Sequence, residues 1–197
     1  MSNFLQFHTL TSYPGTLLNR DDAGFAKTLP FGNAKRTRVS SQCLKYHWRH
    51  YEGKHAIRKA GDMSIRSRRT FRKKIADELV DDGFDDRLTA AVTFGILEMV
   101  RNGDVTKGDI KDNVQPVLEA ETPLDELVID NIVVFGKPEI EYLKSVAEDT
   151  LEALKDKEYN EDSVAQTRDA IADLLGEKQL RNNLRGMGNA MGIDAAM

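Results

Sequence analysis

Apolar residues at helical spacing run through most of the chain from about residue 71 to residue 175, and they constrain the fold more than any other feature. Residues three and four positions apart share one face of an α-helix, so each such row predicts a helix with one buried face. We expect helices ending near Gly83 (buried row Phe71, Ile75, Leu79), over about 86–101 (Leu88, Val92, Ile96, Met99), from Pro138 (Ile140, Leu143, Ala147, Leu151, Leu154) and over about 163–175.

Shorter β-prone segments accompany these helices. The apolar stretch 3–10 predicts a first strand, and the alternating residues 36–40 predict a second strand after a turn at residues 30–32. Residues 127–135 are β-branched and predict a strand pair or an edge strand. Prolines are expected to break the mixed stretch 102–126. The fold class that follows is α+β.

Charge is divided unevenly along the chain. Residues 1–74 hold 16 of the 28 Lys and Arg but 4 of the 32 acidic residues, a net charge of +12, whereas residues 75–197 carry −16. A basic region beside an acidic one is typical of a protein with a nucleic-acid surface. Two regions of opposite charge that simply attract each other explain the same pattern, so charge alone leaves both readings open.

The stretch Lys35–Arg49 concentrates the features of an anion site. Its alternating part predicts a basic strand, and Ser40 or Ser41 is a good N-cap for the helix that follows. Helix amides, a serine hydroxyl and a row of cations would then point toward one region, which suits phosphate. The helical projection places the row Gln42, Lys45, Arg49 outward and the row Leu44, Trp48, Tyr51 inward, as a buried face.

Tyr46 is the one aromatic residue that this projection places beside the basic row. Modules that read RNA bases carry exposed aromatic residues for stacking, so we expect contact with phosphate and sugar and no reading of sequence. A second basic run, Arg66–Lys74, precedes the first long helix, with Arg66, Arg69 and Lys73 opposite its apolar row. A solvated helix face would look the same, but its nearness to Lys35–Arg49 favours RNA contact.

Other chemical candidates are weaker. Asp21 and Asp22 form an adjacent carboxylate pair in a loop, which is more often solvated than catalytic. Cys43, His47 and His50 have metal-ligand spacing, but the chain has one cysteine and no second cluster. Phosphate-binding loops, dinucleotide fingerprints and serine-hydrolase elbows are absent from the sequence. The glycines 186, 188 and 192 are interpreted as a flexible junction, and no metal or other cofactor is expected.

The sequence contains no apolar run of about 18 residues and no secretory signal pattern, so a cytoplasmic protein without a membrane span is expected. The single cysteine fits a reducing compartment.

Residues 4–49 resemble the N-terminus of the CasC family, the repeated backbone subunits of the type I-E CRISPR surveillance complex, Cascade. The resemblance consists of LNRDD at 18–22, Lys27, FG at 31–32, RTR at 36–38 and SSQxLKxxxR at 40–49, with a weaker match at Ser64–Arg66. It implies an RRM-like (ferredoxin-like) palm built from both ends of the chain and a mainly helical fingers insertion. Residues 1–60 would be the first part of the palm, 61–180 the fingers and 181–197 a return segment, with the thumb and second palm half missing.

The resemblance also implies a function. Family members stack head to tail along one CRISPR RNA and hold its backbone so that its bases pair with target DNA. Implied partners are the CRISPR RNA, target DNA, further copies of the chain and the large, small, cap and guide-processing subunits of Cascade. Charge pattern and resemblance together give ten candidate RNA-binding residues: Asn19, Arg20, Lys27, Arg36, Arg38, Ser40, Gln42, Lys45, Arg49 and Arg66.

Two other functions stay open from the sequence. Related backbone subunits of type III complexes cut RNA with a loop aspartate, so Asp21 or Asp22 would serve an RNA-guided ribonuclease. The charge asymmetry would also serve a pure protein-interaction module. The non-catalytic RNA-binding subunit is the leading expectation.

Overall fold

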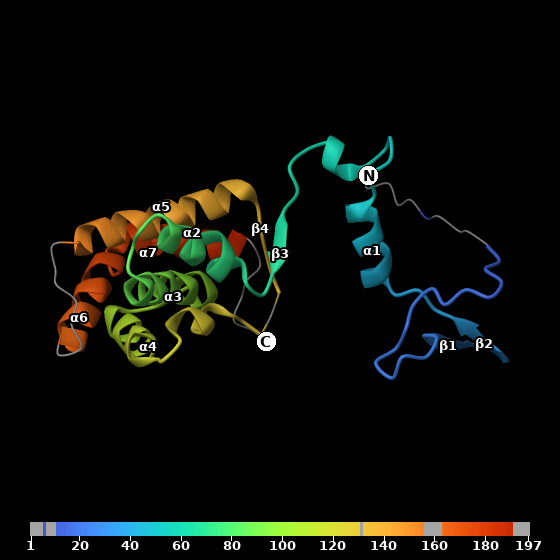
Figure 1. The fold of residues 1–197 in the computed structure, drawn as a ribbon, viewed down its shortest axis with the longest axis horizontal. Coiled ribbons are helices and arrows are strands. Elements are labelled where there is room, and N and C mark those ends of the chain that lie inside the picture. Colours follow the sequence, from blue (N-terminus) through green and yellow to red (C-terminus); the bar gives the residue numbers. More distant parts are fainter. Residues whose placement is uncertain (1–5, 7–10, 131, 156–162, 191–197) are drawn as a thin grey trace. The chain divides into compact units, whose positions relative to one another are not determined.

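The chain is mixed α+β and divides into two compact units, residues 1–61 (unit 1) and 62–197 (unit 2) (Figure 1). The structure is a computed structural model that describes residues 6, 11–130, 132–155 and 163–190. Of the strand predicted at 3–10, only Gln6 lies among these residues. None of the described helices is long and apolar enough to cross a membrane.

Unit 2 is built around α3 (Asp86–Asn102), which contacts α4 (Lys107–Glu119), α5 (Lys137–Leu154), α6 (Val164–Leu175) and α7 (Lys178–Ala190) (Figure 1). The predicted rows on α3 and α5 face this core. Val92, Ile96 and Met99 are buried on α3, and the five residues predicted on α5 are all buried. Helical periodicity therefore predicts both helices and their inner faces.

The start of unit 2 differs from its predicted form. A strand, β3 (Ile65–Ser67), pairs antiparallel with β4 (Val133–Phe135), with Arg66 opposite Val134. Three residues are too short a run for alternation to be visible in the sequence. A π-helix (Arg72–Ala76) and α2 (Asp77–Asp81) follow, and their row Phe71, Ile75, Leu79 is buried as predicted. The rings of Phe71 and Phe135 meet edge to face, with centroids 5.5 Å apart, and tie the helix to the sheet.

The expectation that prolines break residues 102–126 is wrong for Pro116. It lies inside α4, nine residues after the helix begins, so it removes one hydrogen bond close to the C-terminal end. A capping box stabilises the other end of the helix. Thr106 and Asp109 form a reciprocal capping box, and the hydrogen bonds from the Thr106 hydroxyl and backbone N–H lower the pKa of Asp109. Pro123 does end the segment, as the first residue of a 3₁₀-helix (Pro123–Leu127).

The segment interpreted as a flexible junction is helical in its described part. Gly186 and Gly188 lie within α7, and Leu184 of this helix is fully buried. A Cβ on Gly188 would collide with the carbonyl oxygen of Val100 on α3. The glycine therefore permits close helix packing, a role that cannot be told from flexibility in a single sequence.

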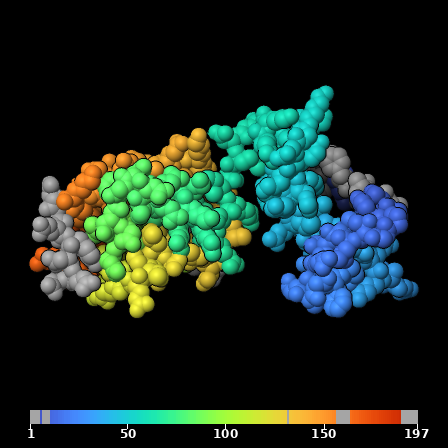
Figure 2. Space-filling view, viewed as in Figure 1, coloured from blue at the N-terminus to red at the C-terminus, as the bar shows by residue number. Residues whose placement is uncertain are grey.

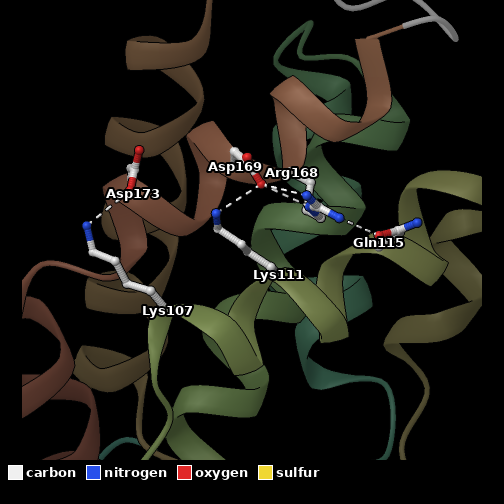
Figure 3. Close-up of polar contacts among 6 residues, drawn as sticks. All are labelled: Lys107, Lys111, Gln115, Arg168, Asp169 and Asp173. Atoms are coloured by element: carbon white, nitrogen blue, oxygen red, sulfur yellow. Dashed lines mark hydrogen bonds and ion pairs between the residues drawn. The ribbon is translucent and has the colours of Figure 1, made fainter.

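A polar seam joins α4 to α6 across the surface of unit 2 (Figure 3). Arg168 donates to Asp169 Oδ1 (2.9 and 3.0 Å) and to Gln115 Oε1 (2.7 Å), and Lys111 Nζ lies 3.1 Å from the same Asp169 oxygen. Lys107 pairs with Asp173 at 3.1 Å. The hydrogen bonds from Arg168 and then Lys111 lower the pKa of Asp169. We call these six residues the α4–α6 seam.

Unit 1 has little secondary structure. β1 (Thr28–Phe31) and β2 (Ala34–Thr37) form an antiparallel hairpin whose turn contains Gly32 at φ 59°. The strand predicted at 36–40 lies at Ala34–Thr37 (β2) instead, and the sequence does not predict its partner β1. α1 (Ser41–His50) and a 3₁₀-turn (Ile57–Lys59) follow. Among the described residues of this unit, Ala56 is the one buried apolar residue.

Candidate nucleic-acid interface

Three hydrogen bonds, one to a side chain and two between backbone groups, bring together four of the predicted contact residues in unit 1. Asn19 Oδ1 accepts from the Ser40 amide at 2.9 Å, and the Asn19 carbonyl accepts from the Lys27 amide at 2.8 Å. The Lys27 carbonyl in turn accepts from the Arg38 amide at 2.7 Å. We call Asn19, Lys27, Arg38 and Ser40 the clamp base. Residues up to 21 positions apart in sequence are thereby held at the start of α1.

A closed turn next to the clamp base contains the carboxylate pair. Arg20 and Ala26 form an isolated antiparallel β-bridge. Asp21 Oδ1 accepts from the amides of Ala23 (3.1 Å) and Phe25 (2.8 Å). Gly24, at φ 85°, completes the turn with its amide donating to the Asp21 carbonyl. The Asp21 carboxylate thus has a structural task, because it satisfies two backbone donors.

The N-terminus of α1 has the form expected of an anion site. Ser40 is the N-cap, and its hydroxyl oxygen accepts from the Cys43 amide at 3.2 Å. The amides of Ser41 and Gln42 have no acceptor among the described residues, so they remain available at the positive end of the helix dipole. Gln42 and Lys45 are exposed and Arg49 is partly exposed, in agreement with the outward row.

The buried face predicted for α1 is wrong. Leu44, Trp48 and Tyr51 are 40%, 58% and 53% exposed, and no residue of α1 is buried. The projection correctly separated apolar from basic residues, but a buried face needs a layer to cover it. Within the described part of unit 1, the one helix or strand that packs against α1 more than marginally is the 3₁₀-turn (Ile57–Lys59).

The expectation that Tyr46 is the sole exposed aromatic residue near the basic row is wrong for the same reason. In the described part of unit 1, the exposed aromatic residues are Tyr13, Phe25, Phe31, Tyr46, Trp48 and Tyr51. The ring of Tyr46 stacks on that of His50 at 4.1 Å, and the Arg36 guanidinium lies 4.3 Å above the Phe31 ring. The hairpin therefore presents a cation next to an aromatic ring, and α1 presents two stacked rings.

Arg66 is the one predicted contact residue that belongs to unit 2. It lies on β3 and is exposed, while its neighbours Ile65 and Ser67 are partly buried. The other nine predicted residues all lie in unit 1.

A metal site built from Cys43, His47 and His50 gains no support. No group of three or more His, Cys, Asp or Glu side chains among the described residues is arranged to hold a metal ion. His50 Nδ1 lies 2.8 Å from the Tyr46 carbonyl oxygen, within the same helix.

Comparison with protein families adds one decisive observation: residues 5–197 match the sequence model of the CT1975-like proteins, a CRISPR-associated (Cas) family. The chain belongs to this Cas family. Comparison with curated proteins and with solved structures gave no match. In this CT1975-like chain, then, the clamp base and α1 belong to a CRISPR-associated protein, and their surface chemistry is to be interpreted in that setting.

Proposed function

We propose that this CT1975-like chain is a non-catalytic, CRISPR RNA-binding backbone subunit of a Cascade-type complex of the type I-E, CasC kind. In this proposal it acts in the cytoplasm, stacks head to tail with further copies along the guide RNA, and presents guide bases for pairing with target DNA. The remaining Cascade subunits and the target DNA are its other partners. Base pairing then reads the sequence, and the protein needs to hold only the RNA backbone.

The clamp base is the observation that carries this proposal. Three hydrogen bonds place Lys27, Arg38 and the α1 N-terminus on one small framework. The Ser41 and Gln42 amides, which have no acceptor in the described part of the chain, then meet the requirements of a phosphate group together with the Ser40 hydroxyl and the Lys27 and Arg38 side chains. The family match supports a CRISPR role, and the motifs at 18–22, 36–38 and 40–49 support the backbone subunit in particular.

The framework also favours binding over catalysis. Asp21 accepts two backbone hydrogen bonds within its own turn, which supports a structural role for its carboxylate. Asp22 is then the remaining candidate for the alternative ribonuclease. The test is to incubate the assembled complex with complementary RNA and magnesium. Cleavage of the RNA that is lost in Asp22→Ala would favour the ribonuclease over the proposed function.

The proposal is tested by reversing two charges on the outward row of α1. We expect Lys45→Glu/Arg49→Glu to weaken binding of single-stranded RNA at least about tenfold, since each charged hydrogen bond contributes about 1.5 kcal/mol or more. The loss is expected to be equal for unrelated RNA sequences. The plot of log affinity against log salt is expected to become less steep by about 1.4, for two lost phosphate contacts.

Lys54→Glu/Lys59→Glu is the matched control, because it makes the same charge change at two exposed residues of unit 1 outside the row. Fluorescence anisotropy over a range of salt concentrations compares both variants with the unaltered protein. Equal losses of RNA affinity in the two variants would mean that net charge, and not the row on α1, determines binding. Unchanged RNA affinity in Lys45→Glu/Arg49→Glu would refute the clamp.

A further inference from the structure

Six cations lie between residues 66 and 74, and the structure divides them into two sets. Arg72 pairs with Asp125 and with Asp77 (3.6 Å), and Lys74 pairs with Glu78 at 3.7 Å. The second set is exposed and has no ion pair with any described residue: Arg66, Arg68, Arg69 and Lys73. Carboxylates of unit 2 thus neutralise one face of this segment and leave the other face positive.

The positive face is held in a fixed shape. The Arg68 carbonyl accepts from the Ile129 amide at 3.1 Å, and the Arg69 amide donates to Ser67 Oγ at 3.0 Å. The Lys73 amide donates to the Arg69 carbonyl at 2.8 Å, which puts these two side chains one helical turn apart on the same face. Beneath them, Thr70 and Phe71 are buried.

The charge of the surrounding unit makes this face unusual. Unit 1 has ten basic and three acidic residues, a net charge of +7, whereas unit 2 has 18 basic and 29 acidic residues, a net charge of −11. The segment that carries the unpaired cations reaches the visible surface of unit 2, where it is coloured teal to green (Figure 2). A local positive face on an acidic body attracts a polyanion while the rest of the body repels it, which also orients the ligand.

The composition of the face favours nucleic acid over an acidic protein partner. Between residues 66 and 74 the one large apolar side chain, Phe71, is 1% exposed, so this stretch itself offers no apolar anchor of the kind on which protein interfaces depend. Arginine guanidinium groups instead match phosphate oxygens in a two-pronged geometry.

We propose that Arg68, Arg69 and Lys73 form a second nucleic-acid contact, on unit 2, that binds a phosphodiester backbone without reading its sequence. We call these three residues the unit 2 cation face. This contact goes beyond the clamp proposed for unit 1 and does not depend on it. Its ligand is a nucleic-acid strand, and single-stranded RNA, single-stranded DNA and duplex DNA share the chemistry that it recognises.

The test uses the full chain and three fluorescent probes of equal length: single-stranded RNA, single-stranded DNA and duplex DNA. We expect Arg68→Gln/Arg69→Gln/Lys73→Gln to make the salt dependence for at least one probe less steep, by about 2 for a single strand with three lost phosphate contacts. The probe with the largest change identifies the strand. Arg68→Lys/Arg69→Lys keeps the charges and is expected to retain most of the salt dependence.

The matched control is Lys107→Gln/Lys137→Gln/Lys155→Gln. It removes the same charge from unit 2 at exposed lysines that already have carboxylate partners. Circular dichroism checks that both triple variants remain folded, which is expected because all six side chains are exposed.

The outcomes separate this proposal from the unit 1 clamp. The cation face is refuted if its triple variant binds all three probes like the control, even where Lys45→Glu/Arg49→Glu loses binding. A loss in the triple variant, with unchanged binding in Lys45→Glu/Arg49→Glu, supports the cation face and refutes the clamp. An unaltered chain that binds none of the probes refutes both.

Discussion

Asn19 shows how one residue can order the segments that carry the proposed clamp. Its Oδ1 accepts the partly buried Ser40 amide and its carbonyl accepts the Lys27 amide, so it joins the loop, the hairpin and the start of α1. From the sequence, Asn19 is expected to contact RNA directly. The structure adds a positioning task, because the hydrogen bond to Ser40 fixes the residue that caps the helix.

We expect Asn19→Ala to destabilise the α1 N-terminus by about 1 kcal/mol, because the Ser40 amide loses its acceptor. Hydrogen exchange measured by mass spectrometry should then accelerate at residues 39–42. Asn19→Asp keeps an acceptor oxygen and is expected to exchange more slowly than Asn19→Ala. Unchanged exchange in Asn19→Ala would show that the hydrogen bond does not order this segment.

On α1 the predictions for charged residues are confirmed and those for apolar residues are wrong, because the two kinds of side chain have different requirements for burial. Cationic residues on the outward row of α1 are exposed as predicted, because a charged side chain stays in water wherever the helix lies. Trp48 is exposed against expectation, because an apolar residue is buried only where another layer covers it. Projection onto a helix identifies the apolar face but does not provide the covering layer.

At the scale of elements, the α4–α6 seam makes helix packing depend on pH. The pKa of Asp169 is lowered in the folded chain, so between the folded and unfolded pKa values the unfolded chain binds more protons. The carboxylate therefore stabilises the fold above its usual pKa of 3.8, and this contribution is lost as the pH falls through the lower folded value.

We accordingly expect Asp169→Asn to lower the melting temperature of unit 2 at neutral pH and to have little effect well below pH 3.8. Thermal unfolding followed by circular dichroism over this range measures the difference between variant and unaltered protein. Asp173→Asn, which leaves the contacts of Arg168 intact, is the companion variant. A difference that is constant with pH would mean that the Asp169 charge is not what matters.

Two glycines of α7 permit a matched test of helix packing. Gly188→Ala is expected to destabilise unit 2 by about 1–3 kcal/mol, because the new methyl group meets the Val100 carbonyl on α3, a backbone atom with little freedom to move. Gly186 has open space around it, so Gly186→Ala is expected to stabilise the helix by about 0.5–1 kcal/mol.

Chemical denaturation of both variants gives the comparison. If the two substitutions had the same sign, α7 would not pack on α3 as described. The sequence predicts neither role, since Gly186 and Gly188 differ only in what lies opposite them in the fold.

At the scale of the whole molecule, apolar periodicity predicts α3, α5, α6 and the helical segment that ends near Gly83, but not α4, α7 or the short strands. Together with the β-prone segments it predicts the α+β class. β1 and β3 have four and three residues, and their pairing partners define them more than their own composition does: β1 pairs with the adjacent β2, and β3 pairs with the distant β4. Pro116 lies inside a helix because the loss of one hydrogen bond is offset by the packing of α4 on α3 and α6. Local signals are sufficient where an apolar row repeats along the element, as on α3, α5 and α6, and they fail where residues elsewhere in the fold decide.

The core is as unevenly divided as the charge. Apart from Ala56, the buried apolar residues of the described chain all lie in unit 2. Unit 1 keeps its described form through hydrogen bonds and turns, and a two-stranded hairpin of this kind is marginally stable alone in water. The proposed RNA clamp therefore lies on the less stable unit, and an RNA ligand that binds the folded form would also stabilise it.

Trp48 is the single tryptophan of the chain, and its side chain is 58% exposed on the unit with almost no core. Tryptophan fluorescence consequently comes from unit 1 alone, and unit 2 contributes nothing to the emission. The protein thus carries a natural optical probe beside Lys45 and Arg49. Changes in the wavelength and intensity of its emission would report RNA binding at the proposed clamp without any attached dye.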